Sequence, residues 1–99
     1  MVEVRQTDEF NGWLKALRDS RARAKIAART RRLADGNPGD VKPVGEGISE
    51  LRIHHGPGYR VYFVKIGDPI VVLLCGGDKS TQSADIANAK AIAQSLEED

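Results

Sequence analysis

The 99-residue sequence contains a single cysteine, Cys75, so no disulfide can form within the chain. Aromatic residues make up only 5% of it. No apolar run approaches the ~18 residues that a membrane-spanning helix needs, and the first residues lack the apolar core of a signal peptide. Cys75 lies in the apolar run 70–75 without a partner base nearby, which is typical of a small buried hydrophobe. These absences predict one cytoplasmic domain spanning 1–99, with no membrane segment.

Charge is nearly balanced overall but unevenly distributed along the chain. The formal net charge is +1, which by itself argues against a strongly nucleic-acid-binding domain. Residues 1–65 carry thirteen basic and eight acidic side chains, whereas 66–99 carry two basic and six acidic ones. Between 15 and 32 there are eight basic residues and only Asp19 as an acid. This asymmetry predicts a polyanionic partner for one part of the molecule, although a solvated helix face has the same composition.

The first third of the sequence indicates a strand followed by two helices. Residues 2–6 alternate apolar and polar, as a half-buried strand does. A cap at Thr7 or Asp8 then begins a helix. Its apolar residues recur at helical spacing: Phe10, Trp13, Leu14 and Leu17. A second helix begins at Asp19–Ser20, and the turn residues 36–40 end it.

Four further strands and a last helix complete the expected fold. The strands are expected at 41–44, 48–55, 59–66 and 70–75, and the helix from Ser80 or Thr81 to Leu96. Pro43 marks an edge strand, and Gly67–Asp68 a two-residue hairpin turn. The run 70–75 is apolar on both faces, as in a central strand. The order β-α-α-β-β-β-β-α predicts an α+β fold. We expect a mostly antiparallel four- to five-stranded sheet, with an N-terminal helical hairpin on one face and a C-terminal helix partly covering the other.

Alternation along the two middle strands brings basic side chains to one polar face. Arg52 and Arg60 fall on this face on either side of a short turn, and Lys79 follows the last strand within reach. Three converging cations repel one another, and their simplest use is to bind an anion such as phosphate. The alternative is that each cation pairs with a local acid, Glu50 beside Arg52 and Asp78 beside Lys79.

Two histidines and two tyrosines lie close to these cations in the sequence. His54 shares their face, where it can act as general acid or base, whereas His55 lies on the opposite face; both can equally be plain turn residues. Tyr62 is oriented to stack on bases, and Tyr59 to pack in the core. No cluster has metal-ligand spacing and no glycine loop cradles phosphate, so we expect neither metal nor cofactor. A nuclease built this way uses the ribose 2′-OH as nucleophile and steadies the phosphorane with Arg or Lys.

Three stretches carry a family resemblance: 50–63 (ELRIHHGPGYRVYF), 73–82 (LLCGGDKSTQ) and 36–40 (GNPGD). They resemble the phage-Gp49-like, HigB-type branch of the RelE/ParE toxin superfamily, often described as addiction-module killer proteins. The resemblance spans nearly the whole chain. It implies a RelE-like fold and the toxin of a type II toxin–antitoxin system, a ribosome-dependent, metal-independent mRNA endonuclease (mRNA interferase). The implied partners are the ribosome, mRNA and a cognate antitoxin, often a helix-turn-helix, HigA-like protein.

The resemblance also assigns residues. Arg60 matches the family's transition-state arginine, and Arg52 and Lys79 match basic positions. RelE relatives carry a tyrosine early in the C-terminal segment, where this chain has Asp85, and no tyrosine follows Tyr62. The general base is therefore open between His54 and Asp85.

Residues outside the central cluster are expected to contact RNA. The RNA- or ribosome-binding set is Tyr62, Arg21, Lys25, Arg29 and Arg32. We expect Arg60→Ala to abolish toxicity while the chain still folds, because an exposed arginine carries little stability.

Two other functions fit the same fold. A ParE-like poison of DNA gyrase is one, although such poisons generally lack converging basic residues. A non-catalytic binding protein is the other, and the missing tyrosine is the best argument for it.

Overall fold

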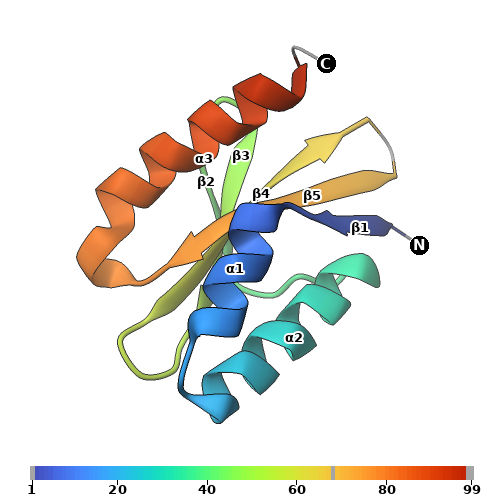
Figure 1. Cartoon of the computed structure of the whole chain (residues 1–99). Coiled ribbons are helices and arrows are strands. Elements are labelled where there is room, and N and C mark those ends of the chain that lie inside the picture. Colours follow the sequence, from blue (N-terminus) through green and yellow to red (C-terminus); the bar gives the residue numbers. More distant parts are fainter. Residues whose placement is uncertain (1, 68, 98–99) are drawn as a thin grey trace.

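The chain folds into a five-stranded sheet with helices on both faces, in a computed structural model that describes residues 2–67 and 69–97 (Figure 1). The elements are β1 (Glu3–Gln6), α1 (Asp8–Ala16), α2 (Ser20–Ala34), β2 (Val41–Gly45), β3 (Ile48–Ile53), β4 (Tyr59–Ile66), β5 (Ile70–Gly77), the 3₁₀ turn η1 (Lys79–Thr81) and α3 (Gln82–Glu97). The element order and the α+β class predicted from the sequence are confirmed.

The sheet has the strand order β1-β5-β4-β3-β2. Neighbouring strands from β2 to β5 are antiparallel, whereas β1 pairs with β5 in parallel, so the sheet is mixed but mostly antiparallel, as predicted. β2 is the edge strand that Pro43 indicated, and its register shifts between Pro43 and Gly45. β4 and β5 pair as far as Ile66 and Ile70, and Asp68 of the expected hairpin turn lies outside the described residues.

Two hydrophobic cores lie on opposite faces of the sheet. The helical hairpin α1–α2 covers the first core, whose buried residues are Phe10, Ile26, Leu33, Leu51, Ile53, Val61, Phe63, Val71 and Leu73. Helix α3 covers the second core, formed by Ile48, Tyr62, Val72, Leu74, Cys75 and Ala89. A register shift opposite Tyr62 and Phe63 leaves Leu74 unpaired in the ladder, so Leu74 and Cys75 both belong to the second core. The prediction that β5 is covered on both faces is confirmed.

Side-chain caps explain where the first two helices begin. The Thr7 hydroxyl accepts a hydrogen bond from the Phe10 backbone N–H at 3.0 Å, and Asp19 caps α2 through the N–H groups of Arg21 and Ala22. Helix α3 begins at Gln82, slightly later than expected, because η1 precedes it. In the part of the chain that the structure describes, no helix is long and apolar enough to cross a membrane.

The β3–β4 connection places the site at one end of the sheet. β3 ends at Ile53 rather than at His55. The backbone turns there, since the His55 N–H donates to the Ile53 carbonyl and the Gly58 N–H to the His55 carbonyl. The end of β5 and the start of η1 lie beside this turn, because Gly77 pairs with Arg60 of β4. Residues distant in sequence therefore meet at this end.

Candidate phosphodiester-binding site

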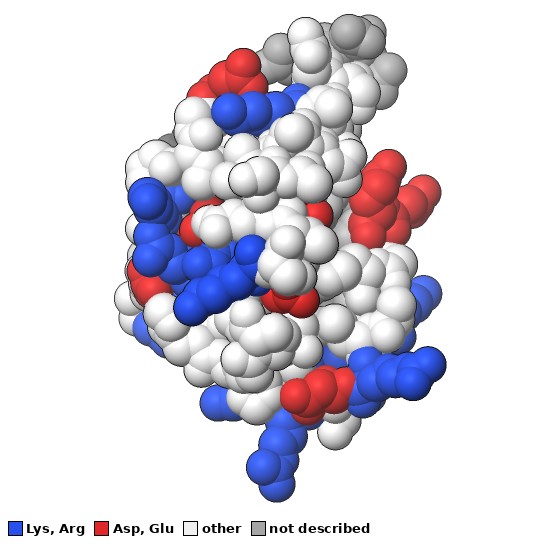
Figure 2. All heavy atoms as spheres, turned by 90° about the vertical axis from the view of Figure 1, so that its left-hand side faces the viewer, with Lys and Arg blue, Asp and Glu red and all other residues white. Residues whose placement is uncertain are grey.

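Arg52 and Arg60 lie directly opposite each other on β3 and β4. Directly opposed residues share a face, here the face that α3 covers. Together with Lys79 and His54 they line a pocket of about 420 Å³ at the β3–β4 turn, called the basic pocket below. Figure 2 looks onto the side of the molecule that carries this turn and the start of α3, and Lys and Arg side chains gather near the centre of that face. The predicted convergence of the three cations is confirmed.

A buried carboxylate lies between the two arginines. Glu50 is only 1% exposed, and its Oε1 and Oε2 lie 3.3 Å from Nε of Arg52 and Arg60, respectively. Arg60 is itself 8% exposed, and its Nη1 donates to the Gly58 carbonyl at 3.0 Å. The expectation that Arg60 is an exposed arginine of little structural weight is therefore wrong. The alternative, in which a local acid pairs with each cation, is correct for Arg52, which pairs with Glu50. Arg60 pairs with the same acid.

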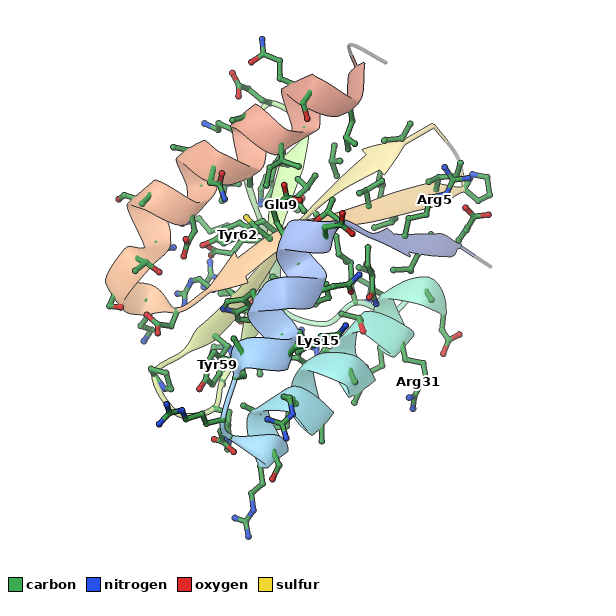
Figure 3. The ribbon with its side chains drawn as sticks, in the orientation of Figure 1. Arg5, Glu9, Lys15, Arg31, Tyr59 and Tyr62 are labelled. Atoms are coloured by element: carbon green, nitrogen blue, oxygen red, sulfur yellow. The ribbon has the colours of Figure 1, made fainter. Side chains whose placement is uncertain are left out.

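Two further side chains orient the Glu50 carboxylate. The Tyr62 hydroxyl donates to Oε2 at 3.2 Å, and Gln82 Nε2, from the first residue of α3, donates to the same oxygen at 2.8 Å. Figure 3 shows Tyr62 between the sheet and α3. Burial, followed by the nearby Glu50 charge, raises the pKa of Tyr62 above its ordinary value. Tyr62 is fully buried, so the prediction that it stacks on RNA bases is wrong.

Lys79 reaches the basic pocket across a glycine. The side-chain carbons of Lys79 lie 3.0–3.2 Å from the position that a Cβ of Gly58 would occupy, so a side chain at Gly58 would displace them. The Asp78 carboxylate instead accepts hydrogen bonds from the backbone N–H and hydroxyl of Ser80, which lower the pKa of Asp78. The alternative pairing of Asp78 with Lys79 is wrong, and Lys79 makes no ion pair within the described residues.

The two histidines occupy different environments. His54 is 74% exposed, lies at the rim of the basic pocket, and places Nε2 2.5 Å from the Asp40 carboxylate. His55 is 22% exposed; its Nε2 contacts Asp19 at 2.9 Å and its ring stacks on Tyr59. The hydrogen bonds with the imidazoles lower the pKa of Asp40 and of Asp19. Tyr59 packs against the first core as predicted, and His54 is the more accessible histidine.

The basic residues of α2 divide by environment. Arg29 is turned inward: its Nη1 donates to the Arg52 carbonyl at 2.7 Å and its Nη2 to the Pro38 carbonyl at 2.9 Å. Burial, followed by the charge of Arg32, lowers the pKa of Arg29. Arg29 therefore ties α2 to the end of β3, and backbone carbonyls engage both of its terminal nitrogens. Its contact with RNA stays a prediction. Arg21, Lys25 and Arg32 are exposed and available to a ligand.

Asp85 lies close to the basic pocket but outside its lining. Its Oδ2 accepts a hydrogen bond from the Thr81 hydroxyl at 2.6 Å and packs against Gly77, where an added Cβ would lie 1.8 Å from it. Of the two candidate general bases, only His54 lines the basic pocket. In residues 2–67 and 69–97, no three His, Cys, Asp or Glu side chains form a group that could hold a metal ion.

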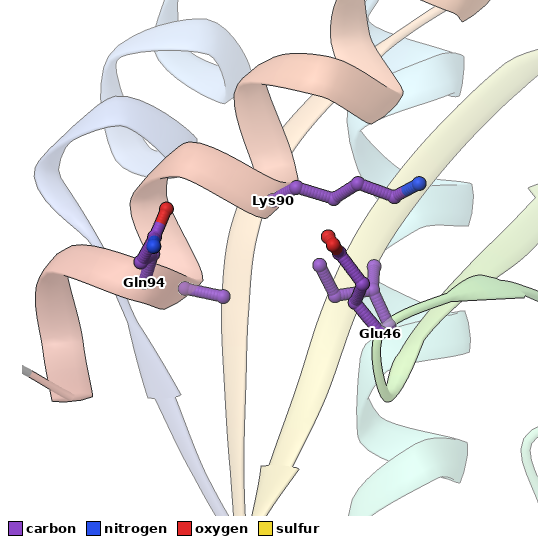
Figure 4. Close-up of a pocket in the computed structure, with 5 residues that line it drawn as sticks. Glu46, Lys90 and Gln94 are labelled. Atoms are coloured by element: carbon purple, nitrogen blue, oxygen red, sulfur yellow. The ribbon is translucent and has the colours of Figure 1, made fainter.

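Another pocket, of about 250 Å³, lies at the opposite end of β3 from the β3–β4 turn. It is lined by Glu46, Ile48, Lys90, Ala93 and Gln94, and Figure 4 shows the Lys90 side chain extending towards Glu46. A pocket that contains both an acid and a base does not select anions as the basic pocket does.

Sequence reasoning underestimated one residue of the candidate site, Glu50. The signal was present, because a glutamate on a strand whose neighbours are buried needs cationic partners, and Arg52 and Arg60 are the nearest.

Comparison with known protein families gives a match over most of the chain. A family model described as "Phage derived protein Gp49-like (DUF891)" matches residues 12–97, which include all four predicted catalytic residues. A protein of Haemophilus influenzae described as "Uncharacterized protein" is 53% identical over 95 residues, which cover 96% of each chain. No solved structure matches the chain.

Proposed function

The chain belongs to the Gp49-like family of phage-derived proteins, the addiction-module killer or HigB-like family, whose members are commonly toxins of toxin–antitoxin systems. On this premise we propose that it is a type II toxin that cleaves messenger RNA on the ribosome. The observation that carries the proposal is the basic pocket, in which Arg52, Arg60 and Lys79 converge beside an accessible imidazole.

The charge of the basic pocket suits a phosphodiester in its transition state. Three cations face one buried carboxylate, so a net positive charge is left for the non-bridging oxygens of the phosphate. These oxygens gain charge as the phosphorane forms, and cations held in place beforehand stabilise them without reorganisation. In the proposed reaction Arg60 and Lys79 have this role.

The cleavage step follows from RNA chemistry. The ribose 2′-oxygen forms a bond to the adjacent phosphorus while the bond to the 5′-oxygen of the next nucleotide breaks. The products are a 2′,3′-cyclic phosphate and a 5′-hydroxyl. His54 accepts the proton of the 2′-hydroxyl, because it is the exposed imidazole on the rim of the basic pocket, and Asp40 holds the ring through Nε2. A proton from solvent or a neighbouring acid completes the leaving 5′-hydroxyl.

Glu50 acts in this proposal as a positioning residue. It contacts Nε of both arginines, and Tyr62 and Gln82 hold its own orientation. An arginine side chain samples many rotamers unless something holds it, and loss of that hold reduces transition-state stabilisation.

The proposed partners follow from the family. The ribosome presents the message in the cytoplasm, and exposed basic residues of α2 such as Arg21 contact ribosomal RNA phosphates. A cognate antitoxin, a small helix-turn-helix, HigA-like protein, neutralises the toxin in the same cell.

Primer extension on a defined message in a cell-free translation extract tests the proposal. We expect new 5′ ends in register with codons, and only while ribosomes translate. Lys79→Ala and His54→Ala should each slow cleavage by roughly 10²-fold or more. Both side chains are exposed, so their removal should preserve folding. Lys15→Ala, an exposed lysine on α1, is the matched control and should cleave at the wild-type rate (Figure 3).

Two results would contradict the proposal. An intact message with undiminished translation would exclude an mRNA interferase, and gyrase supercoiling would be the next assay. Cleavage at the wild-type rate by both the Lys79 and His54 variants would show that the basic pocket is not the site.

A further inference from the structure

A second pocket of about 300 Å³ lies between α2 and the end of β3. It is called the helix groove below and is lined by Lys25, Ala28, Arg29, Arg32, Ile53 and His54. The spacing of Lys25, Arg29 and Arg32 along α2 explains why these side chains share one face of the helix.

The helix groove adjoins the basic pocket. Ile53 and His54 line both, and the exposed His54 side chain stands where the two meet. The two linings together contain six basic residues and no acidic one: Lys25, Arg29, Arg32, Arg52, Arg60 and Lys79. A polyanion that enters one pocket can therefore continue into the other without meeting a carboxylate in either lining.

The cations of the helix groove are not neutralised by the protein. Lys25 and Arg32 make no ion pair within the described residues. Arg32 also acts on Arg29, whose pKa it lowers, so the two guanidiniums repel each other. The charge of Asp40 acts on Arg29, but the Asp40 carboxylate is engaged by His54. An anion bound beside Arg32 in the helix groove would offset its repulsion with Arg29.

A purely structural role explains Arg29 but not its neighbours. The hydrogen bonds of Arg29 to backbone carbonyls anchor α2 to β3. Lys25 and Arg32 have no such bonds within the described residues, and the fold does not need their charge. Arg31 of the same helix points away from the sheet and lines neither pocket (Figure 3).

We propose that the helix groove is a second phosphate subsite, which holds a backbone phosphate of the same RNA strand whose neighbouring phosphodiester lies in the basic pocket. This inference rests on the proposed function and adds to it a path for the substrate. The strand passes over His54, which places a 2′-hydroxyl beside the imidazole. Lys25 and Arg32 bind the flanking phosphate, and Arg29 holds the wall of the helix groove.

Equilibrium binding of an uncleavable strand tests the subsite. The probe is a fluorescein-labelled, fully 2′-O-methylated hexaribonucleotide, which lacks the attacking hydroxyl, so the result does not depend on cleavage. Fluorescence anisotropy gives its affinity from 50 to 200 mM KCl. The test variant is Lys25→Ala/Arg32→Ala. The control is Lys15→Ala/Arg31→Ala, which removes the same charges from exposed positions outside both pockets (Figure 3).

We expect the wild type to bind one hexamer per chain. Each phosphate contact to a single strand contributes about 0.7 to the slope of log affinity against log salt. Raising KCl from 50 to 200 mM lowers the affinity of each protein by some factor. Because the test variant loses two contacts, this factor should be about sevenfold smaller for it than for the wild type. The control should keep the wild-type slope, and Lys79→Ala should weaken the same binding event.

Several results would overturn the subsite. Wild-type affinity and slope in the test variant would remove Lys25 and Arg32 from the strand's path. An equal loss of affinity in the control variant would show that the effect comes from the net charge of the protein and not from the helix groove. Two hexamers per chain, each lost in a different variant, would assign the helix groove to a separate RNA such as ribosomal RNA. Absence of wild-type binding at 50 mM KCl would exclude it as an RNA site. Each of these leaves the proposed cleavage intact, which the translation assay tests by itself.

Discussion

Replacing Arg60 with alanine should destabilise the fold as well as remove a cation from the basic pocket. The Arg60 side chain is 10% exposed and the Glu50 side chain 1%, and their ion pair joins β3 to β4 beneath the start of α3. Without Arg60, the Glu50 charge stays buried with less compensation. An exposed arginine would have no such effect, because most surface substitutions change stability by less than about 0.5 kcal/mol.

The expected loss of stability in Arg60→Ala depends on the partners that Glu50 retains. Removing one partner of a buried ion pair costs about 3–5 kcal/mol when the other charge is left alone. Here Glu50 retains Arg52 at 3.3 Å and hydrogen bonds from Tyr62 and Gln82. We therefore expect a loss of about 2–3 kcal/mol in the free energy of unfolding, below the full penalty. For a domain of this length that lowers Tm by roughly 8–24 °C.

Urea denaturation followed by circular dichroism measures this loss. Arg31→Ala, which removes an exposed arginine from α2, is the control and should unfold within about 0.5 kcal/mol of the wild type. Combining Arg60→Ala with Glu50→Gln should cost less than the sum of the two single losses, by about 0.5–3 kcal/mol, since the two groups interact directly. A free energy of unfolding for Arg60→Ala within 0.5 kcal/mol of the wild type would refute the reasoning.

Three further predictions concern other parts of the fold. Gly76→Ala should cost about 1–3 kcal/mol in urea denaturation, because its Cβ would lie 2.3 Å from ring carbons of Trp13, whereas Gly12→Ala meets nothing and should not destabilise. Burial raises the pKa of Cys75 to about 12, so iodoacetamide at pH 8 should leave the thiol unmodified in native protein and alkylate it in urea. A hydrogen bond with the His54 imidazole lowers the pKa of Asp40 in the folded protein. The ionised Asp40 therefore stabilises the fold at pH values above its pKa in the unfolded chain, about 3.9, and this stabilisation disappears as the pH falls through the lower pKa of the folded protein. Asp40→Asn should therefore flatten the acid-unfolding profile there, and an unchanged profile would contradict this.

Local chemistry determined the elements and the faces of their residues. Turn residues at 36–40 and 56–58 and caps at Thr7 and Asp19 act over a few residues, so the element order could be predicted from the sequence. The period of two along a strand likewise placed Arg52 and Arg60 on one face.

Only the tertiary structure decided which side chains of the candidate site are buried and which groups they contact. Tyr62 was correctly assigned to the face that carries the arginines, but α3 covers that part of the sheet, so a residue expected to meet RNA is in the core. Arg29 and Lys25 are both basic residues on one face of α2, yet only Arg29 donates a hydrogen bond to the carbonyl at the end of β3. Glu50 depends on residues up to 32 positions away for its contacts.

The physical reason for this division is the range of the interactions. Caps, turns and alternation depend on neighbours in the sequence, whereas burial and charge pairing depend on which elements pack together. The sequence by itself determined the strands, the helices and the convergence of cations at one end of the sheet. The packing of α3 and α2 against that end decided which of those cations are held by the protein and which remain available to a ligand.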